Sequence, residues 1–323
     1  VKPGEIAEIR SYLQANASKV WVETENSIPE VIDGGKSYDD LTSADYRLHA
    51  DKVTLAVYEE LKTWIENDCF EMIPRHGSRN ILDVRWVGKW KKLKDPKDPS
   101  KFIWGIRMRM TQRGFKDELA GKLKTFSGTS SRTSQRIVVS ECTCRRWKMA
   151  TLDVKKAFLK GVTYQELADL TGEPLRQVNF EITEEVAKIL RKFKGFEKFD
   201  RKLHVLKNKK PGTGTQDAPR CFGIKLKRAT HDRFGAKSTT HDPQLIVKHS
   251  QKELVLIGTV HVDDIKVAWG DDQVFRDLIS ALETIFGKGE VEITHDNFAC
   301  CGVQYKMLSD GYSMDQINYV KAI

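Results

Sequence analysis

Long hydrophobic runs are missing from this sequence of 323 residues. The longest apolar stretch, residues 254–260, is far shorter than the roughly 20 residues that a membrane-spanning helix needs, so we expect no membrane partner. The first residues lack the layout of a secretory signal peptide, which favours an intracellular protein that is not secreted. Cysteine is also sparse: six residues are too few for a disulfide scaffold, and we expect reduced thiols.

Acidic residues are scarce in one segment, residues 85–116. The whole chain has 54 basic and 45 acidic residues, a net charge of +9. This segment alone holds eleven basic and two acidic residues, so it accounts for the entire surplus. Such a concentration of positive charge is typical of a surface that binds a polyanion, most often nucleic acid. The alternative interpretation is a solvated basic loop without a ligand.

The spacing of apolar residues predicts a mixture of helices and hairpins, and hence an α+β fold. Residues 1–48 are net acidic and weakly periodic, as expected of an arm or linker. Strands at 81–90 and 102–110 flank a turn-rich tip at 94–100, which predicts a basic hairpin. Its tryptophans, Trp86, Trp90 and Trp104, either stack on bases or pack between strands. We expect other helices near 52–68, 137–142, 183–192, from 217 onward and at 271–286. We expect other strands near 70–73, 148–154, 245–248, 253–260, 265–269, 291–294 and 302–306.

The sharpest local feature is the adjacent pair Asp263 and Asp264, which lies between two apolar strands. Two carboxylates at the tip of an otherwise buried hairpin are unfavourable unless a cation neutralises them. Mg²⁺ is the obvious candidate, because it prefers carboxylate oxygens and keeps positions open for phosphate. The alternative is an ordinary polar turn, since short motifs of this kind occur often without a ligand.

A third carboxylate, Asp153, ends a short apolar strand and is followed by Lys155 and Lys156. If Asp153 lies beside Asp263, the two suit a pair of Mg²⁺ ions about 4 Å apart, as two-metal phosphoryl transfer requires. Without a cation, carboxylates about 4 Å apart repel by about 4 kcal/mol at an effective dielectric constant near 20. The alternative for Asp153 alone is a polar cap at a strand end.

Two other patterns are too incomplete to predict a site. The pairs Cys142 with Cys144 and Cys300 with Cys301 lack the second pair of ligands and the histidine spacing of a zinc site, so we expect structural thiols. The basic, glycine-containing segment 207–214 lacks the spacing of a phosphate-binding P-loop.

Several segments together resemble the reverse transcriptase of copia-type retrotransposons. Six motifs of that family occur in the family's order between about residues 50 and 323. They are Trp86–Lys91 (Trp-Val-x-Lys-x-Lys), Arg107–Phe115 (the Lys-Ala-Arg strand ending in Gly-Phe), Asp153–Gly161 (Asp-Val-Lys-x-Ala-Phe-Leu-x-Gly), Gly214–Arg220 (ending in Ala-Pro-Arg), Asp242–Pro243, and His261–Ile265 (x-Val-Asp-Asp-Ile).

This resemblance implies the palm and fingers of a right-hand polymerase, with an antiparallel palm sheet backed by helices. It implies an arm or linker over 1–48 and a reverse transcriptase region over 49–323, with fingers mainly at 70–135, palm mainly at 145–323, and thumb and RNase H domains absent. The implied activity is RNA-directed DNA synthesis with two Mg²⁺ ions, or Mn²⁺ in their place. The implied partners are an RNA template, a DNA primer, deoxynucleoside triphosphates, and the integrase and RNase H regions of a longer polyprotein.

The resemblance also implies roles for individual residues. Catalysis falls to Asp153, Asp263 and Asp264, and metal binding to these three and the carbonyl of Val154. The implied nucleotide-binding residues are Arg107, Arg109, Lys156, Ala157, Phe158, Gln216 and Asp217. Among them, Phe158 would lie under the incoming sugar and exclude a 2′-hydroxyl. The implied nucleic-acid-binding residues are Lys89, Lys91, Lys92, Lys94, Arg113, Cys301 and Gly302, the last two at the primer-grip hairpin.

Two departures from the family pattern affect the functional prediction. His261 stands where the family has Tyr, and Asp217 stands where it has Gln, with Gln216 one place early. A carboxylate at 217 is expected near the nucleotide, where it would weaken binding or alter selectivity. These departures favour the alternative of a catalytically decayed, nucleic-acid-binding remnant. A third reading is a different two-metal nucleotidyltransferase.

Overall fold

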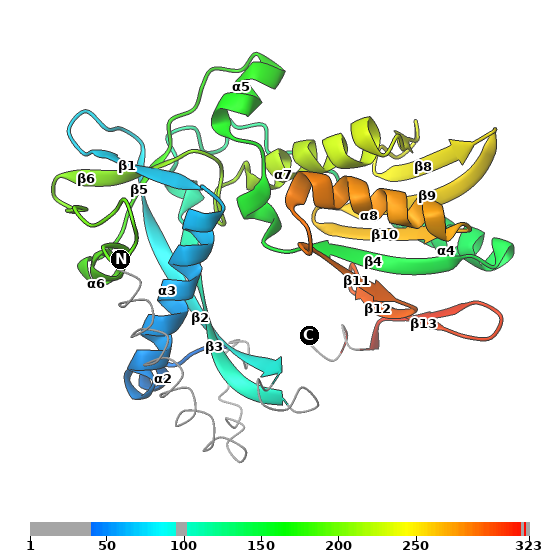
Figure 1. Cartoon of the computed structure of the whole chain (residues 1–323), viewed down its shortest axis with the longest axis horizontal. Coiled ribbons are helices and arrows are strands. Elements are labelled where there is room, and N and C mark those ends of the chain that lie inside the picture. The colour runs from blue at the N-terminus through cyan, green and yellow to red at the C-terminus, as the bar shows by residue number, and fades with distance from the viewer. Residues whose placement is uncertain (1–39, 95–101, 318–319, 321–323) are drawn as a thin grey trace. The chain divides into compact units, whose positions relative to one another are not determined.

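The computed structural model describes residues 40–94, 102–317 and 320. The chain forms two units, and each is assembled from separate stretches of sequence. The first unit comprises residues 1–120 and 177–215, and the second comprises 121–176 and 216–323. Residues 177–215 therefore pack with the first unit, although the predicted palm extends mainly over 145–323. Both units are α+β, with sheets backed by helices (Figure 1).

The first unit contains a five-stranded sheet in the order β1-β6-β5-β2-β3. Its strands are β1 (Phe70–Pro74), β2 (Ile81–Lys94), β3 (Phe102–Gln112), β5 (Asn179–Glu181) and β6 (His204–Asn208). Its helices are α2 (Ser43–Leu48), α3 (Ala50–Glu66), α6 (Glu184–Leu190) and the 3₁₀ turn η1 (Gly114–Lys116). The strands β2 and β5 run parallel, and the other pairs in this sheet are antiparallel.

Helix α3 follows from helical spacing of apolar residues. Val57, Leu61 and Trp64 recur every three or four positions and are buried. This stripe packs against β3, whose Met108 and Met110 are also buried. Because side chains alternate along a strand, the hairpin β2–β3 has one face toward the helix and the opposite face free of it.

The second unit contains a six-stranded antiparallel sheet in the order β11-β4-β10-β9-β8-β7 and a three-stranded sheet in the order β12-β13-β14. The strands of the larger sheet are β4 (Lys148–Val154), β7 (Lys237–Ser238), β8 (Leu245–Ser250), β9 (Glu253–His261), β10 (Asp264–Trp269) and β11 (Val291–His295). Those of the smaller sheet are β12 (Asn297–Cys300), β13 (Val303–Met307) and β14 (Tyr312–Asp315). The helices are α4 (Arg132–Arg145), α5 (Tyr164–Thr171), α7 (Ala218–Lys227), α8 (Asp272–Phe286), the 3₁₀ turn η2 (Ala157–Lys160) and the π-helix η3 (Arg228–Arg233).

The two faces of the larger sheet have different coverings. One face carries Leu152, Ile265 and Val267, which form a core with residues of α7 and α8. Figure 1 shows α8 lying across β9 and β10 on this side. The opposite face carries Met149 and Ala268, which pack with α4 and the smaller sheet. Along β4 and β10, every second side chain faces α8, and the side chains between them therefore face α4.

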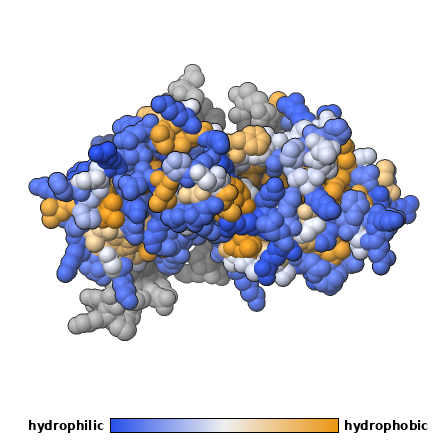
Figure 2. Space-filling model, turned by 90° about the horizontal axis from the view of Figure 1, so that it is seen from above, coloured by the Kyte–Doolittle hydropathy of each residue, from blue (hydrophilic) through white to orange (hydrophobic). Residues whose placement is uncertain are grey.

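The polar composition of the chain is reflected in its mostly hydrophilic visible surface and in the modest apolar character of its described helices. Figure 2 shows hydrophilic side chains over most of the visible face, with hydrophobic side chains in groups between them. Among the described residues, no helix combines the length and apolar character needed to cross a membrane.

The region at 161–210 and the N-terminal arm are more structured than the sequence predicts. The former holds α5, β5, α6 and β6, of which only α6 matches a predicted element, and β6 takes in Lys207 and Asn208 from the basic, glycine-containing segment 207–214. In the arm, residues 43–48 form α2 and Asp40 bridges to Lys89. Residues 1–39 of the predicted arm and 95–101 of the predicted hairpin tip lie outside the described residues.

Candidate active site

The antiparallel register brings acidic side chains into one row across the larger sheet. Asp264 pairs with Asp153, which in turn pairs with Glu292 on β11. On the other side, Asp264 pairs with His261 of β9. Directly opposed residues on neighbouring strands project from the same face. The row Glu292, Asp153, Asp264 and His261 therefore lies on the face that packs α4.

Asp263 lies in the two-residue turn that connects β9 to β10. The sequence pattern predicts this hairpin correctly. Asp264 is the register partner of Asp153, and Asp263 also lies close enough to Asp153 to repel its carboxylate. The turn has a strained backbone, because Val262 has φ of 60°, which β-branched residues avoid. The Val262 N–H donates to the Gly128 carbonyl oxygen at 3.2 Å, and this contact helps to hold the turn.

The carboxylates of the row repel one another. Partial burial, and then repulsion from Asp263, Glu292 and Asp264, raise the pKa of the Asp153 carboxyl above its usual value. Burial and Asp263 likewise raise the pKa of Asp264, although the Cys301 backbone N–H donates to its carboxylate and acts in the opposite direction. A cluster of this kind is stabilised by a bound cation.

The donor set of the cluster fits magnesium. Asp153, Asp263 and Asp264 offer carboxylate oxygens, which are the ligands that Mg²⁺ prefers. Val154 ends β4 with its side chain buried in the core, so its backbone carbonyl is the group that it can offer to a metal.

The predicted nucleotide-binding residues after β4 are Lys156, in the turn before η2, and Ala157 and Phe158, at the start of η2. Lys156 is exposed with φ of 56°, whereas Ala157 is buried and Phe158 packs partly against the core of α7 and α8. The next lysine, Lys160, is buried and pairs with Glu290. Lys156 is therefore an exposed cation close in sequence to Asp153, and Phe158 retains part of its surface.

Asp217, which the sequence predicts near the nucleotide, has an internal partner. Its side chain is 2% exposed and forms an ion pair with Arg176, whose side chain is 10% exposed. The neighbouring Gln216 accepts a hydrogen bond from the Gly121 N–H at 3.4 Å. The structure thus explains how a carboxylate is accommodated at this position, and its role toward a nucleotide stays a prediction.

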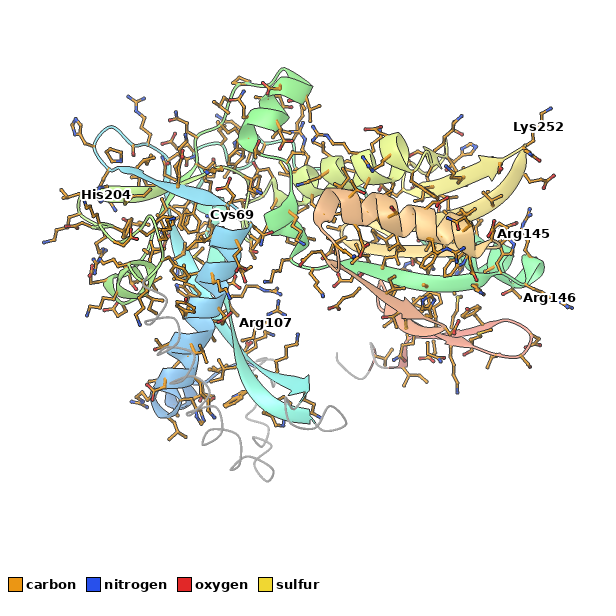
Figure 3. The ribbon with its side chains drawn as sticks, viewed as in Figure 1. Cys69, Arg107, Arg145, Arg146, His204 and Lys252 are labelled. Atoms are coloured by element: carbon orange, nitrogen blue, oxygen red, sulfur yellow. The ribbon has the colours of Figure 1, made fainter. Side chains whose placement is uncertain are left out.

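In the first unit, one face of the hairpin β2–β3 gathers cations. Register pairing opposes Lys89 to Arg107 and Val87 to Arg109, so these side chains project from the face opposite α3. The exposed cations on this face are Arg85, Lys89, Lys91, Arg107 and Arg109. Figure 3 labels Arg107 on β3. We call these five residues the basic face of the hairpin.

The like charges on the basic face repel one another and lower the stability of the hairpin. Although Arg107 is exposed, partial desolvation by the neighbouring hairpin, and then repulsion from Arg109, lower its pKa. Directly opposed like charges such as Lys89 and Arg107 destabilise a sheet pair. Asp40 relieves part of this cost, because it lies 3.3 Å from the Lys89 ammonium. The remaining repulsion favours an anionic ligand.

The other predicted nucleic-acid-binding cations of this region are placed differently. Lys92 projects from the opposite face, where its ammonium lies 5.3 Å from the centre of the Trp104 ring. Arg113 pairs with Asp83 at 2.9 Å. Lys94 ends β2, and its side chain lies outside the described part of the chain. Of the predicted lysines, Lys89 and Lys91 combine exposure with a place on the basic face.

The tryptophans of the hairpin support packing rather than base stacking. Trp86, Trp90 and Trp104 are half-buried and alternate with the basic residues, so they share the face toward α3. Trp90 also makes an edge contact with His49, at 5.2 Å between ring centres.

Cys301 and Gly302 form the two-residue turn between β12 and β13. Their φ angles of 53° and 75° are both positive, as in the tight hairpin turn of type I′. Glycine suits the second position, whereas cysteine at the first position adopts a backbone conformation that side chains disfavour.

Two residues of the site are absent from the sequence prediction. Glu292 enters the acidic row only through the pairing of β11 with β4, which no local pattern reveals. Arg176 follows α5 in a region without clear apolar periodicity. Its positive charge is the only feature of the sequence that could have indicated its pairing with Asp217.

Comparisons with known proteins show which polyproteins the chain is similar to. It is 24% identical over 267 residues to the retrovirus-related Pol polyprotein from transposon RE1 of Arabidopsis thaliana, covering 82% of the chain. It is 25% identical over 271 residues, or 83% of the chain, to the corresponding polyprotein from transposon RE2. A third match, to the polyprotein from transposon TNT 1-94 of Nicotiana tabacum, is 24% identical and covers 72% of the chain and 15% of the polyprotein. The chain is a distant homologue of copia-type Pol polyproteins.

The homology to these Pol polyproteins extends over both units but is limited to a section of the relatives. The chain covers 16% of the RE1 and RE2 polyproteins. No protein-family model matches the chain. Solved telomerase structures from Candida tropicalis and Candida albicans align with 80% of the chain and 59% and 51% of their own length, at TM-scores of 0.38 and 0.39 and 9% identity.

Proposed function

We propose that this chain is the fingers and palm region of an RNA-directed DNA polymerase from a copia-type Pol polyprotein. The observation that supports this most strongly is the register pairing of Asp153 with Asp264, with Asp263 in the adjoining turn. Carboxylates on neighbouring antiparallel strands suit two-metal phosphoryl transfer, which needs charge neutralisation more than covalent chemistry.

In this proposal the three aspartates bind metal, with the Val154 carbonyl as a further ligand. Two Mg²⁺ ions, when bound, would activate the primer 3′-hydroxyl and neutralise the departing pyrophosphate. Phe158 would limit the space at the sugar, so that deoxynucleotides are accepted. Arg107 and Arg109 of the basic face would bind the triphosphate, since paired guanidinium groups suit phosphate oxygens.

The internal pairing of Asp217 bears on the alternative of a decayed remnant. A free carboxylate at this position would argue for loss of nucleotide binding. The ion pair with Arg176 compensates its charge within the second unit, so this departure from the family pattern weighs less against an active enzyme.

Primer extension tests the proposal. The full chain is incubated with oligo-dT annealed to poly-rA, dTTP and Mg²⁺, and product length is measured on a gel. We expect extension that depends on Mg²⁺ or Mn²⁺. We expect Asp153→Asn and Asp264→Asn each to reduce the rate by at least a hundredfold, because each removes a charged ligand. Absence of extension by the wild-type chain with either metal would contradict catalysis and favour the remnant.

The matched control is Asp310→Asn, which changes the same chemical group at an exposed position between β13 and β14. It should extend the primer at the wild-type rate. If Asp310→Asn lost activity to the same degree as the site variants, the loss would reflect general damage rather than the acidic row.

A further inference from the structure

Two neighbouring thiols lie beside the acidic row. The sulfur atoms of Cys300 and Cys301 are 3.6 Å apart. One ligand atom from each of Cys300, Cys301 and Asp264 lies within 4.8 Å of the other two. Cys300 is buried, and Cys301 and Asp264 are half-buried. The sequence offered no second pair of zinc ligands here, but the third ligand comes from a different strand, β10.

The backbone turn brings the two thiols together. Consecutive side chains in a strand point to opposite faces, so two adjacent cysteines in a regular strand would diverge. Cys300 ends β12, and Cys301 begins the turn with φ of 53°. Because this positive φ redirects the second side chain, both thiols reach the same side. The Cys301 backbone N–H also faces the Asp264 carboxylate closely enough to favour its charged form, so the turn lies beside the end of β10.

The sulfur separation suits a metal with thiolate ligands. Two thiolates bonded to one tetrahedral Zn²⁺ at about 2.3 Å have sulfur atoms roughly 3.8 Å apart. Thiolates select Zn²⁺ and similar soft or borderline cations, whereas Mg²⁺ prefers oxygen. The half-buried edge of the cluster leaves a fourth position for solvent.

A buried lysine balances the charge. Lys266 is fully buried, donates to the Gln135 carbonyl oxygen at 3.0 Å and to the Tyr305 hydroxyl at 2.8 Å, and interacts electrostatically with both cysteines. Two thiolates, one carboxylate and one ammonium sum to a charge of −2, which one divalent cation neutralises. A neutral set is what burial requires, because uncompensated charge in an interior is costly.

We propose that Cys300, Cys301 and Asp264 form a binding site for a thiophilic divalent cation, with Zn²⁺ as the ligand. Binding releases the two thiol protons to solvent and forms two sulfur–metal bonds and one oxygen–metal bond, with no change in oxidation state. Its consequence rests on the proposed function. Occupancy withdraws Asp264 from the catalytic carboxylates, so Zn²⁺ inhibits polymerisation at this site.

Cadmium titration tests the binding step without reference to activity. The full chain, kept reduced with a phosphine, is titrated with Cd²⁺, and the ultraviolet charge-transfer band of cadmium thiolate is recorded. We expect saturation at one equivalent and displacement of Cd²⁺ by Zn²⁺. Asp264→Asn should weaken binding at least tenfold. Cys300→Ala and Cys301→Gly should each lose the saturating phase, and glycine at 301 keeps the positive φ so that the fold is retained.

Cys144→Ala is the control, since Cys144 is an exposed thiol on α4. It should leave the saturating phase unchanged. The proposal is overturned if the wild-type chain gives no saturable band, or if the band survives both Cys300→Ala and Cys301→Gly.

The inhibitory consequence has its own measurement. Zn²⁺ at saturating Mg²⁺ should slow primer extension by the wild-type chain. We define zinc sensitivity as the ratio of the extension rates without and with Zn²⁺, measured for each chain separately. This ratio should be at least tenfold smaller for Cys300→Ala than for the wild type. Equal sensitivity in Cys300→Ala would refute inhibition through this site. If the chain does not extend primers at all, the proposed function fails while the cadmium titration still decides the binding site.

Discussion

Arg176 is the residue on which the buried carboxylate of Asp217 depends. The two side chains are 10% and 2% exposed, so solvent contributes little to either charge. The Arg176 guanidinium also lies 5.3 Å from the centre of the Tyr164 ring, at the start of α5. Removing one partner of a buried pair leaves the other charge uncompensated, which costs more than the pair itself contributes.

We therefore expect Arg176→Met to destabilise the chain by about 3–5 kcal/mol. Urea unfolding followed by circular dichroism measures the change. Adding Asp217→Asn to Arg176→Met should recover most of the loss, because no buried charge then remains. Arg145→Met removes a surface pair with Glu141 and should cost about 0–1 kcal/mol. A loss for Arg176→Met no larger than for this control would contradict the argument.

Part of the positive charge surplus of the chain lies on one face of the hairpin β2–β3, the basic face. A count of charges predicts a polyanion surface, and the β-strand alternation then divides the hairpin into a face toward α3 and a face of cations. Among the described residues, Asp40 pairs with one cation of this face, Lys89, while Arg107 and Arg109 repel each other.

Binding of an oligo-dT·poly-rA duplex should weaken steeply with salt if this face contacts phosphates. About six contacts would reduce affinity on the order of a thousandfold between 50 and 200 mM salt. Lys91→Gln and Arg107→Gln should each lower the slope of log affinity against log salt by about 1. Lys92→Gln, on the opposite face, should change it less, and Lys62→Gln on α3 should not change it. Equal slopes for all four variants in fluorescence anisotropy would count against the basic face.

Local patterns predict some elements well. Apolar spacing predicts α3 and α8, the latter ending just before Gly287 as expected. The hairpin of β9 and β10 is also confirmed, because its strands are continuous apolar runs around a polar turn. Elements held by distant partners are not visible in this way: β5 has three residues, and its place depends on pairing with both β2 and β6.

The candidate site likewise contains residues that local patterns predict and residues whose place depends on distant partners. The sequence predicts that Asp153, Asp263 and Asp264 belong together, and the register places Asp153 opposite Asp264. It does not reveal Glu292, because strand pairing across more than a hundred residues has no local signal. Nor does it reveal the contact of Cys301 with Asp264, which depends on packing of the smaller sheet.

The segment just after α5 is linked to α7 by a charged contact that should titrate. Glu173 accepts two hydrogen bonds from Arg220, at 2.8 and 3.0 Å, and lies 3.1 Å from the Lys124 ammonium. The hydrogen bonds from Arg220 contribute most to lowering the pKa of Glu173 from 4.5 to about 2. Because the folded pKa is depressed, the stabilisation is fully present above about pH 4.5 and is lost as the pH falls toward 2.

We expect Glu173→Gln to reduce the loss of melting temperature between pH 4.5 and 2, a window given by the usual and folded pKa values. The variant should be less stable than the wild type at pH 6 and close to it at pH 2. Glu253→Gln, at the exposed start of β9, is the matched control. A wild-type pH profile for Glu173→Gln in thermal unfolding would show that the contact contributes nothing to stability.

The path of the chain makes the first unit depend on a late segment. Residues 177–215 return to this unit after residues 121–176 have entered the second. The segment supplies β6 and β5, which lie between β1 and β2 in the sheet. It also supplies Phe180, whose ring centre is 5.3 Å from that of Phe70 and 6.2 Å from that of Trp64.

A chain that ends after Arg176 should therefore fail to form the first unit. Without β6, the strand β1 has no neighbour in its sheet, and the aromatic contact between Phe70 and Phe180 is lost. A chain that ends after Thr215 contains the whole unit and should protect the β1 amides from hydrogen exchange, measured by mass spectrometry. The shorter chain should exchange them at least a hundredfold faster. Equal protection in the two chains would mean that local structure in residues 1–120 suffices, and that the return of the chain adds strands without determining the fold.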